Sequence, residues 1–151
     1  QAKKYEFLLG IFETKFSSYN AEGALYSNDD KGLYGIFFTF DLDTSNDNKY
    51  IDAYFNLKEL LTKKYGEPGF VKEQLEYPYK DDFPRGDHAG QALSIGKGSY
   101  GAIFQCDNDP NKYIQLLLTG DNYEIELLLG YYDKNYDKTK EEKLNESLDE
   151  F

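Results

Sequence analysis

The chain has 151 residues, a length that fits one domain with its own hydrophobic core, so the sequence predicts a single domain over residues 1–151. Its 28 Asp and Glu side chains outnumber 17 Lys and Arg side chains, and the net charge of −11 makes nucleic acid an unfavourable partner and a basic protein or a cation a better one. The single cysteine, Cys106, excludes an internal disulfide, and no apolar run approaches the roughly 20 residues that a membrane-spanning helix needs.

The start of the chain bears on its location. It begins with Gln1 and contains no methionine, as expected when a signal segment or a lipid-anchored leader has been removed. This predicts an exported protein, in the periplasm or on the cell surface. A shortened expression product would begin in the same way, so a cytoplasmic location stays open.

The first forty residues predict strands. Residues Tyr5 to Phe16 are rich in Tyr, Phe and Ile, which favours a strand that bends at Gly10, with a helix as the alternative. A polar turn over Ser17 to Gly23 and a short strand over Ala24 to Ser27 follow. The next strand, Leu33 to Asp41, is apolar on both faces, which is typical of a strand in the middle of a sheet or of one covered by a helix on one face and a second layer on the other.

The stretch from Lys49 to Pro68 predicts the main helix. Its apolar residues recur at helical period and form one stripe: Tyr50, Tyr54, Leu57, Leu61 and Tyr65. Ala53 and Leu60 lie at the edge of this stripe. Short polar side chains that can cap a helix precede it, namely Ser45, Asn46, Asp47 and Asn48. At the other end, Gly66 can take a positive φ and Pro68 prevents continuation.

The rest of the chain predicts further strands and a tail. Phe70 to Tyr77 has the pattern of a half-exposed edge strand, and a long connection over Tyr77 to Gly90 follows. Next come three strands in a meander, over Gln91 to Ile95, Tyr100 to Cys106 and Tyr113 to Thr119. A fourth strand, Tyr123 to Tyr132, is amphipathic and is expected to turn Tyr123 inward. A short C-terminal helix is expected over Thr139 to Leu148; it has only Leu144 and Leu148 as apolar anchors, so it should pack weakly or fray.

Together these elements predict an α+β fold with a single curved antiparallel sheet, the main helix on one face and the short C-terminal helix. In outline this topology resembles the TATA-binding-protein-like arrangement, while the acidic charge argues against a DNA-binding use of it. The run from Leu57 to Pro68, in which leucines at helical spacing lead into Lys64-Tyr65-Gly66-Glu67-Pro68, resembles small uncharacterised bacterial exported domains and lipoproteins. That resemblance implies export and no known catalytic residues.

Four aspartates suggest a metal site before the helix. Asp41, Asp43, Asp47 and Asp52 have nearly the spacing of a calcium-binding loop, in which alternate residues direct oxygens at one ion. Asn46 stands where such a loop has glycine, and Asp52 where it has a longer glutamate. A loop rich in helix-capping residues is the alternative, so calcium is a possible ligand and no other cofactor is expected.

The sequence carries no catalytic motif. Cys106 and His88 are the only candidates for thiol chemistry, and Cys106 continues the alternation of Ala102 and Phe104, which favours a buried hydrophobe. We therefore expect no enzymatic activity and predict no catalytic residues.

The long connection is the best candidate for recognition, because connections of this length in a compact domain tend to be functional or disordered. It contains the aromatic and charged side chains that anchor protein contacts, namely Tyr77, Tyr79, Phe83, Arg85, Asp87 and His88. A packed or mobile loop is the alternative.

The sequence thus predicts a non-enzymatic exported binding or adaptor domain that contacts a protein through its acidic surface and the 77–90 loop. A carbohydrate or small-ligand module using some of the 15 tyrosines, and an acidic immunity or inhibitor protein for a basic toxin, are the alternative functions.

Overall fold

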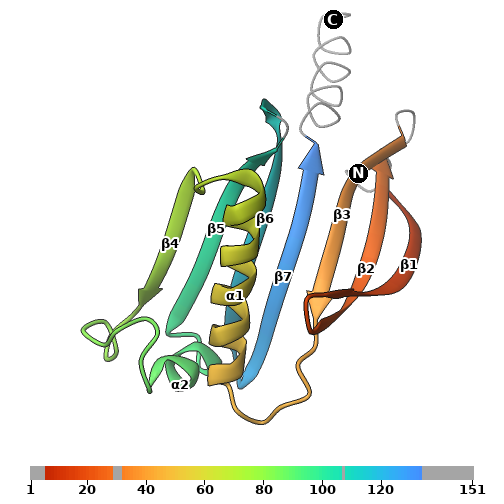
Figure 1. Cartoon of the computed structure of the whole chain (residues 1–151). Coiled ribbons are helices and arrows are strands. Elements are labelled where there is room, and N and C mark those ends of the chain that lie inside the picture. Colours follow the sequence, from red (N-terminus) through yellow and green to blue (C-terminus); the bar gives the residue numbers. More distant parts are fainter. Residues whose placement is uncertain (1–5, 29–31, 107, 134–151) are drawn as a thin grey trace, which may run out of the picture.

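The computed structural model describes residues 6–28, 32–106 and 108–133, which form a seven-stranded antiparallel sheet with two helices (Figure 1). In chain order the elements are β1 (Glu6–Phe16), β2 (Tyr19–Asn28), β3 (Gly32–Phe40), α1 (Asn48–Tyr65), β4 (Phe70–Leu75), α2 (Ala89–Ser94), β5 (Gly98–Cys106), β6 (Asp109–Asp121) and β7 (Glu124–Asp133). This confirms the predicted α+β class with a main helix on a single antiparallel sheet. The predicted C-terminal helix, Thr139 to Leu148, lies outside the described residues.

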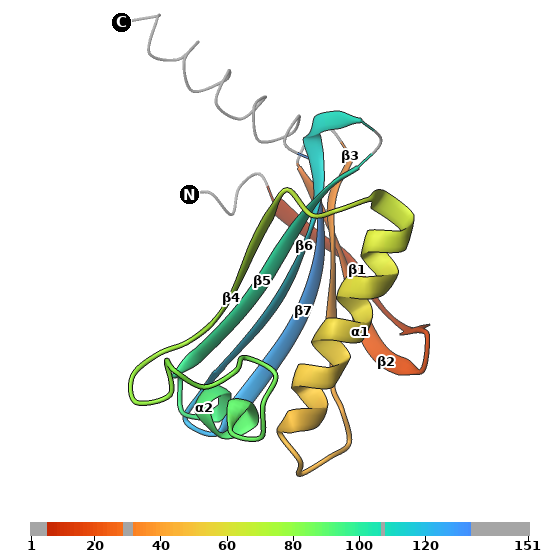
Figure 2. The same cartoon turned by 60° about the vertical axis from the view of Figure 1, so that its left-hand side comes forward.

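Two meanders build the sheet, whose strand order is β1-β2-β3-β7-β6-β5-β4. They meet where β3 pairs with β7, so that Phe38 lies opposite Leu129 and Phe40 opposite Leu127. Between β3 and β4 the chain crosses from the middle of the sheet to its far edge, and α1 makes that crossing. Because both helices pack on the same face, the opposite face of the sheet carries no helix among the described residues (Figures 1 and 2). We call this opposite surface the open face.

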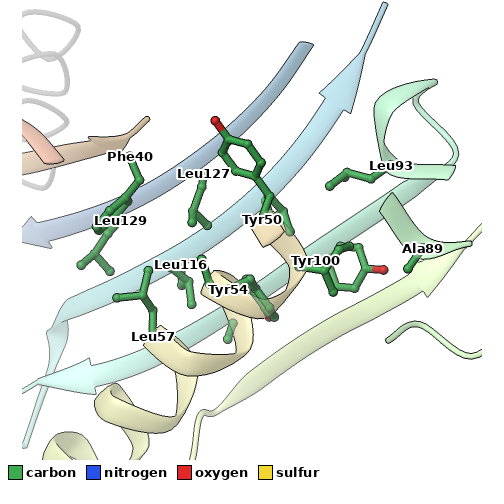
Figure 3. Close-up of a cluster of buried hydrophobic side chains, with 14 of the residues drawn as sticks. Phe40, Tyr50, Tyr54, Leu57, Ala89, Leu93, Tyr100, Leu116, Leu127 and Leu129 are labelled. Carbon is green, nitrogen blue, oxygen red and sulfur yellow. The ribbon is translucent and has the colours of Figure 1, made fainter. Parts of the chain in front are cut away.

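The main helix forms because its apolar stripe has this sheet to cover. The residues of α1 that become buried are Tyr50, Ile51, Ala53, Tyr54 and Leu57, against the leucines of β6 and β7 (Figure 3). Two fully buried tyrosines, Tyr54 and Tyr100, lie with their ring centroids 5.5 Å apart beneath the helix. Leu60, at the edge of the predicted stripe, stays 45% exposed. No helix within the described residues is both long and apolar enough to cross a membrane.

Of the residues predicted to end and to cap the helix, some act as predicted. Gly66 has a φ of 88° and donates its N–H to the Thr62 carbonyl, which ends the helix. At the start, Asn46 Oδ1 accepts the N–H of Asn48 at 3.1 Å, while Asp47, which occupies the N-cap position, makes no side-chain cap. The side chain of Asn48 is used for another contact, with α2.

Two predictions about the elements were wrong. The segment Gln91 to Ile95, expected as a strand, lies in α2 over Ala89–Ser94 and at the turn after it. Residues 19–23, expected as a turn, belong to β2, because the chain reverses at Ser17 and Ser18. At Gly10, where a bend was expected, the pairing of β1 with β2 is irregular between Leu8 and Gly10.

Candidate functional site

The predicted recognition loop lies at one end of the sheet, where β4 ends and α2 begins (Figures 1 and 2). We call residues 76–88 the end loop. The turn between β6 and β7 lies beside α2 at the same end, because the N–H of Tyr123 donates to the Ser94 carbonyl at 2.7 Å.

The backbone of the end loop is a series of hydrogen-bonded turns. The N–H of Tyr79 donates to the Glu76 carbonyl, that of Asp82 to the Tyr79 carbonyl, and that of Gly86 to the Phe83 carbonyl, over 2.7 to 2.8 Å. At its start, the N–H of Glu76 donates to the Lys97 carbonyl at 2.7 Å. These bonds satisfy backbone groups locally, so the loop has a defined shape despite its length.

Side chains from α1 and β5 attach the loop to the core. Tyr100 donates its hydroxyl to the Pro84 carbonyl at 2.5 Å, and the Arg85 guanidinium lies 4.6 Å from the centroid of the Phe55 ring. The Asn48 side chain makes two contacts: Nδ2 donates to the Asp87 carbonyl at 3.3 Å, and Oδ1 accepts the N–H of Gly90 at 2.8 Å. One amide thus attaches both the end of the loop and the first turn of α2 to the start of α1.

Beneath the loop, a small polar cluster shares the core with these aromatic rings. Glu73 Oε2 accepts the Tyr54 hydroxyl at 2.9 Å and pairs with Lys58 Nζ at 2.6 Å. Burial raises the pKa of Tyr100 to about 12, and burial together with the hydrogen bond to Glu73 raises the pKa of Tyr54 further. Both phenols are therefore neutral at physiological pH and serve as hydrogen-bond donors that hold the loop and the edge strand in place.

With its backbone fixed, the end loop presents two aromatic rings to solvent. The side chains of Tyr77 and Phe83 are 76% and 73% exposed. Tyr79, between them in sequence, packs against the core instead. Of the six predicted residues, Tyr77 and Phe83 are thus presented outward, whereas Tyr79 and Arg85 are engaged by the fold.

A third exposed aromatic residue belongs to the same end of the molecule. Tyr123 was expected to point into the core, which is wrong: it is 80% exposed and sits in the turn between β6 and β7. Asp121 and Glu124 are the last paired residues of the hairpin, and both residues between them have positive φ, 51° for Asn122 and 66° for Tyr123. Of these two turn residues only Asn122 is of a type that favours this conformation, so the sequence signal for the turn was a single residue.

The end loop is also acidic. Its carboxylates are those of Glu76, Asp81, Asp82 and Asp87, against two basic side chains, Lys80 and Arg85. His88 Nδ1 lies 3.6 Å from Asp82 Oδ2, an ion pair when the imidazole is protonated. The surface around the exposed rings therefore favours a partner with positive charge.

The other predicted site residues are not gathered into a site. No group of three or more His, Cys, Asp or Glu side chains in the described part of the chain is placed to hold a metal ion, so the geometry gives calcium at Asp41, Asp43, Asp47 and Asp52 no support. Cys106 is buried at one end of β5, and His88 precedes α2 at the other end of this nine-residue strand. At about 3.3 Å per residue the strand spans roughly 25 Å, so the fold keeps these two residues apart.

The end of the sheet thus combines a fixed loop, three exposed aromatic side chains and several carboxylates. This arrangement has the chemistry of a protein-recognition surface, in which aromatic anchors are surrounded by polar groups. Comparisons of the chain with known protein families, with characterised proteins and with solved structures found no match.

Proposed function

We propose that this chain is a protein-binding domain whose partner is a basic protein, engaged at the end of the sheet through Tyr77, Phe83 and Tyr123. The observation that carries the proposal is the contrast within the end loop. Its backbone is attached to the core at Pro84 and Asp87, yet Tyr77 and Phe83 are both more than 70% exposed. A loop held this firmly has no need of outward rings for its own stability.

The energetics of association favour such a surface. A partner that covers an exposed aromatic ring gains apolar burial, and large aromatic residues dominate the binding free energy at protein interfaces. Binding also costs the entropy of ordering loops and side chains at the interface. Because the end loop is already ordered by its turns and by Asn48, this cost is reduced.

Charge supports a basic partner in particular. The whole chain carries a net charge of −11, and the end loop has four acidic residues against two basic ones. Opposite charges accelerate encounter and discriminate between partners, and their effect weakens as salt screens them. Arg85 keeps its positive charge beside the Phe55 ring, but the four carboxylates of the loop outnumber it and Lys80.

The test is affinity capture from an extract of the source organism with the full chain as bait, at low and high salt, followed by calorimetry with the purified partner. We expect a basic protein that is retained at low salt and released at high salt. Tyr77→Ser and Phe83→Ser should each weaken its binding by about tenfold or more, as is typical of aromatic anchors. Phe70→Ser is the matched control, because Phe70 is also an exposed ring, 56%, but lies at the far end of β4.

A partner that binds all three variants equally would locate the interface elsewhere on the domain. Retention of no protein at either salt would contradict the proposed function itself.

A further inference from the structure

The strand β1 forms one edge of the sheet (Figure 1). Among the described residues it pairs with β2 alone, and this pairing is regular from Gly10 to Phe16. Hydrogen-bonded and non-hydrogen-bonded pairs alternate along an antiparallel ladder, so every second residue of β1 directs its backbone N–H and C=O away from β2. Such an edge can accept a further strand, which is how many proteins bind an extended peptide.

The two edges of the sheet differ in how well they are protected from such pairing. The strand at the other edge, β4, has six residues and carries Lys72 in its middle, and short length and lysine both discourage edge pairing. Its exposed apolar side chains, Phe70 and Val71, are confined to its start. By contrast β1 has 11 residues, and the exposed fractions of Leu8 and Ile11 are 53% and 60%. The β1 edge is therefore the better suited to accept another strand.

Beside β1, the open face has an apolar depression of about 520 Å³. Apolar side chains of four strands line it, namely Leu8, Ile11, Ala24, Tyr26, Phe37 and Leu128. Ile11 lies directly opposite Ala24, and Ala24 lies opposite Phe37. An apolar side chain opposite Ile11 on an added strand would continue this cross-strand row and gain burial at its open end.

The next residue on the same face of β1 is acidic. Glu13 lies directly opposite Glu22, and like charges in this position destabilise a sheet. Within the described part of the chain, neither carboxylate forms an ion pair. Both line a second depression, of about 580 Å³, which Asp41 also borders, whereas Lys15 lies opposite Asn20. A basic side chain opposite Glu13 would therefore relieve the repulsion between the two glutamates.

A second copy of the chain fits this edge less well than a basic segment does. Each copy carries a net charge of −11, so two copies repel each other. Pairing of two β1 strands would also place Glu13 and Glu22 of both copies at one interface, without adding a charge that compensates them. Charge complementarity thus favours a different protein as the occupant.

We propose that β1 binds an extended segment of a partner protein as an additional strand, antiparallel to β1, with an apolar residue opposite Ile11 and a basic residue opposite Glu13. The antiparallel direction continues the pattern of the whole sheet. In that direction the basic residue of the segment precedes the apolar one, and one residue separates them. Since β1 and β4 lie at opposite edges, this surface is separate from the proposed interface at the end loop and does not depend on it.

An NMR titration of the isotope-labelled full chain with the peptide Thr-Glu-Thr-Lys-Tyr-Val-Thr tests the proposal. The peptide is acetylated and amidated, and in the proposed register its Lys lies opposite Glu13 and its Val opposite Ile11. A second peptide has Glu in place of this Lys. We expect the first peptide to shift the amide signals of Gly10 to Phe16 until they saturate, and the second to bind about fivefold or more weakly.

A charge reversal in the chain supplies the matched comparison. Glu13→Lys should reverse the order of the two peptides, because the preferred charge opposite this residue changes sign. Glu59→Lys makes the same change in net charge at a side chain that is 67% exposed on α1, on the other face of the sheet, and should leave the order unchanged.

Backbone pairing is tested with two N-methylated forms of the first peptide. Only alternate amides of an added strand face β1, so methylation of Glu, Lys and Val and methylation of the residues between them should have opposite effects: one form should lose binding and the other should keep it.

The proposal would be overturned by the absence of a saturable shift at β1, by equal affinity of the Lys and Glu peptides, by an order that survives Glu13→Lys, or by equal binding of the two N-methylated forms. Sedimentation of the chain as a dimer whose β1 amides do not respond to either peptide would assign the edge to a second copy instead.

Discussion

Replacing Tyr123 with glycine should stabilise the fold while weakening partner binding. Tyr123 has a φ of 66°, in the left-handed region that side chains with a Cβ rarely adopt. Its ring is 80% exposed, so the fold gains little from burying it. A residue held in an unfavourable conformation without compensating burial is a candidate for function.

The magnitude follows from two opposing terms. Left-handed backbone costs a residue with a side chain about 1–2 kcal/mol, and glycine removes that cost. Glycine also has more conformational freedom in the unfolded chain, which lowers the free energy of unfolding by about 0.5–1 kcal/mol. The net gain is about 1 kcal/mol, or a rise in Tm of about 2–4 °C for a domain of this size.

Thermal unfolding followed by circular dichroism measures this change, and two neighbouring variants are its controls. Asn122→Gly should raise Tm less, because asparagine tolerates its positive φ of 51°. Glu124→Gly should lower Tm, because Glu124 is in β7, where glycine weakens a strand. A Tm for Tyr123→Gly at or below that of the parent would refute the strain argument, and unchanged affinity for the partner would remove Tyr123 from the proposed interface.

Three further predictions concern the attachment of the end loop and the buried tyrosines. Asn48→Ala should lower the free energy of unfolding by about 1–3 kcal/mol in a denaturant titration, because the buried N–H of Gly90 loses its acceptor. Hydrogen exchange at Gly90 should become faster, and unchanged exchange would contradict the role given to the Asn48 amide. Gly90→Ala should cost a similar amount, about 1–3 kcal/mol, because a Cβ there would lie 2.7 Å from the backbone nitrogen of Asn48, whereas Gly69→Ala, with no atom within 4 Å, should stay within about 0.5 kcal/mol of the parent. The free energy of unfolding should fall as pH rises from about 10 to 12, because the unfolded chain then releases the phenol protons that folded Tyr54 and Tyr100 retain. Urea titrations across that range should show a less steep fall for Tyr54→Phe.

The elements that the sequence predicted well are those whose periodicity is long and regular. The stripe of α1 is such a case, because 18 residues at helical spacing leave one face that has to be buried. The edge position expected for the strand after the helix is confirmed for β4, which pairs with β5 alone and in which Leu75 is the one buried residue. The strand at Leu33 to Asp41 was expected in the middle of the sheet and lies there as β3.

Short segments were misassigned because their patterns fit two structures. Six residues make up α2, too few to distinguish helical from alternating spacing, and the contacts that select the helix come from distant parts of the chain. The Asn48 side chain accepts the N–H of Gly90, and the backbone of Leu93 lies close to Gly120. A sequence pattern cannot include such contacts before the fold is known.

The candidate site, too, could be predicted from the sequence only in part. The sequence by itself determined that the stretch around Tyr77 and Phe83 continues neither a helix nor a strand, because prolines and glycines interrupt both periods. Only the tertiary structure decided which rings face outward, since attachment by Asn48, Tyr100 and Phe55 fixes the direction of the loop backbone. It also added Tyr123: the alternation of apolar residues extends the predicted strand back to Tyr123, whereas pairing with β6 begins β7 at Glu124 and leaves that ring in the turn.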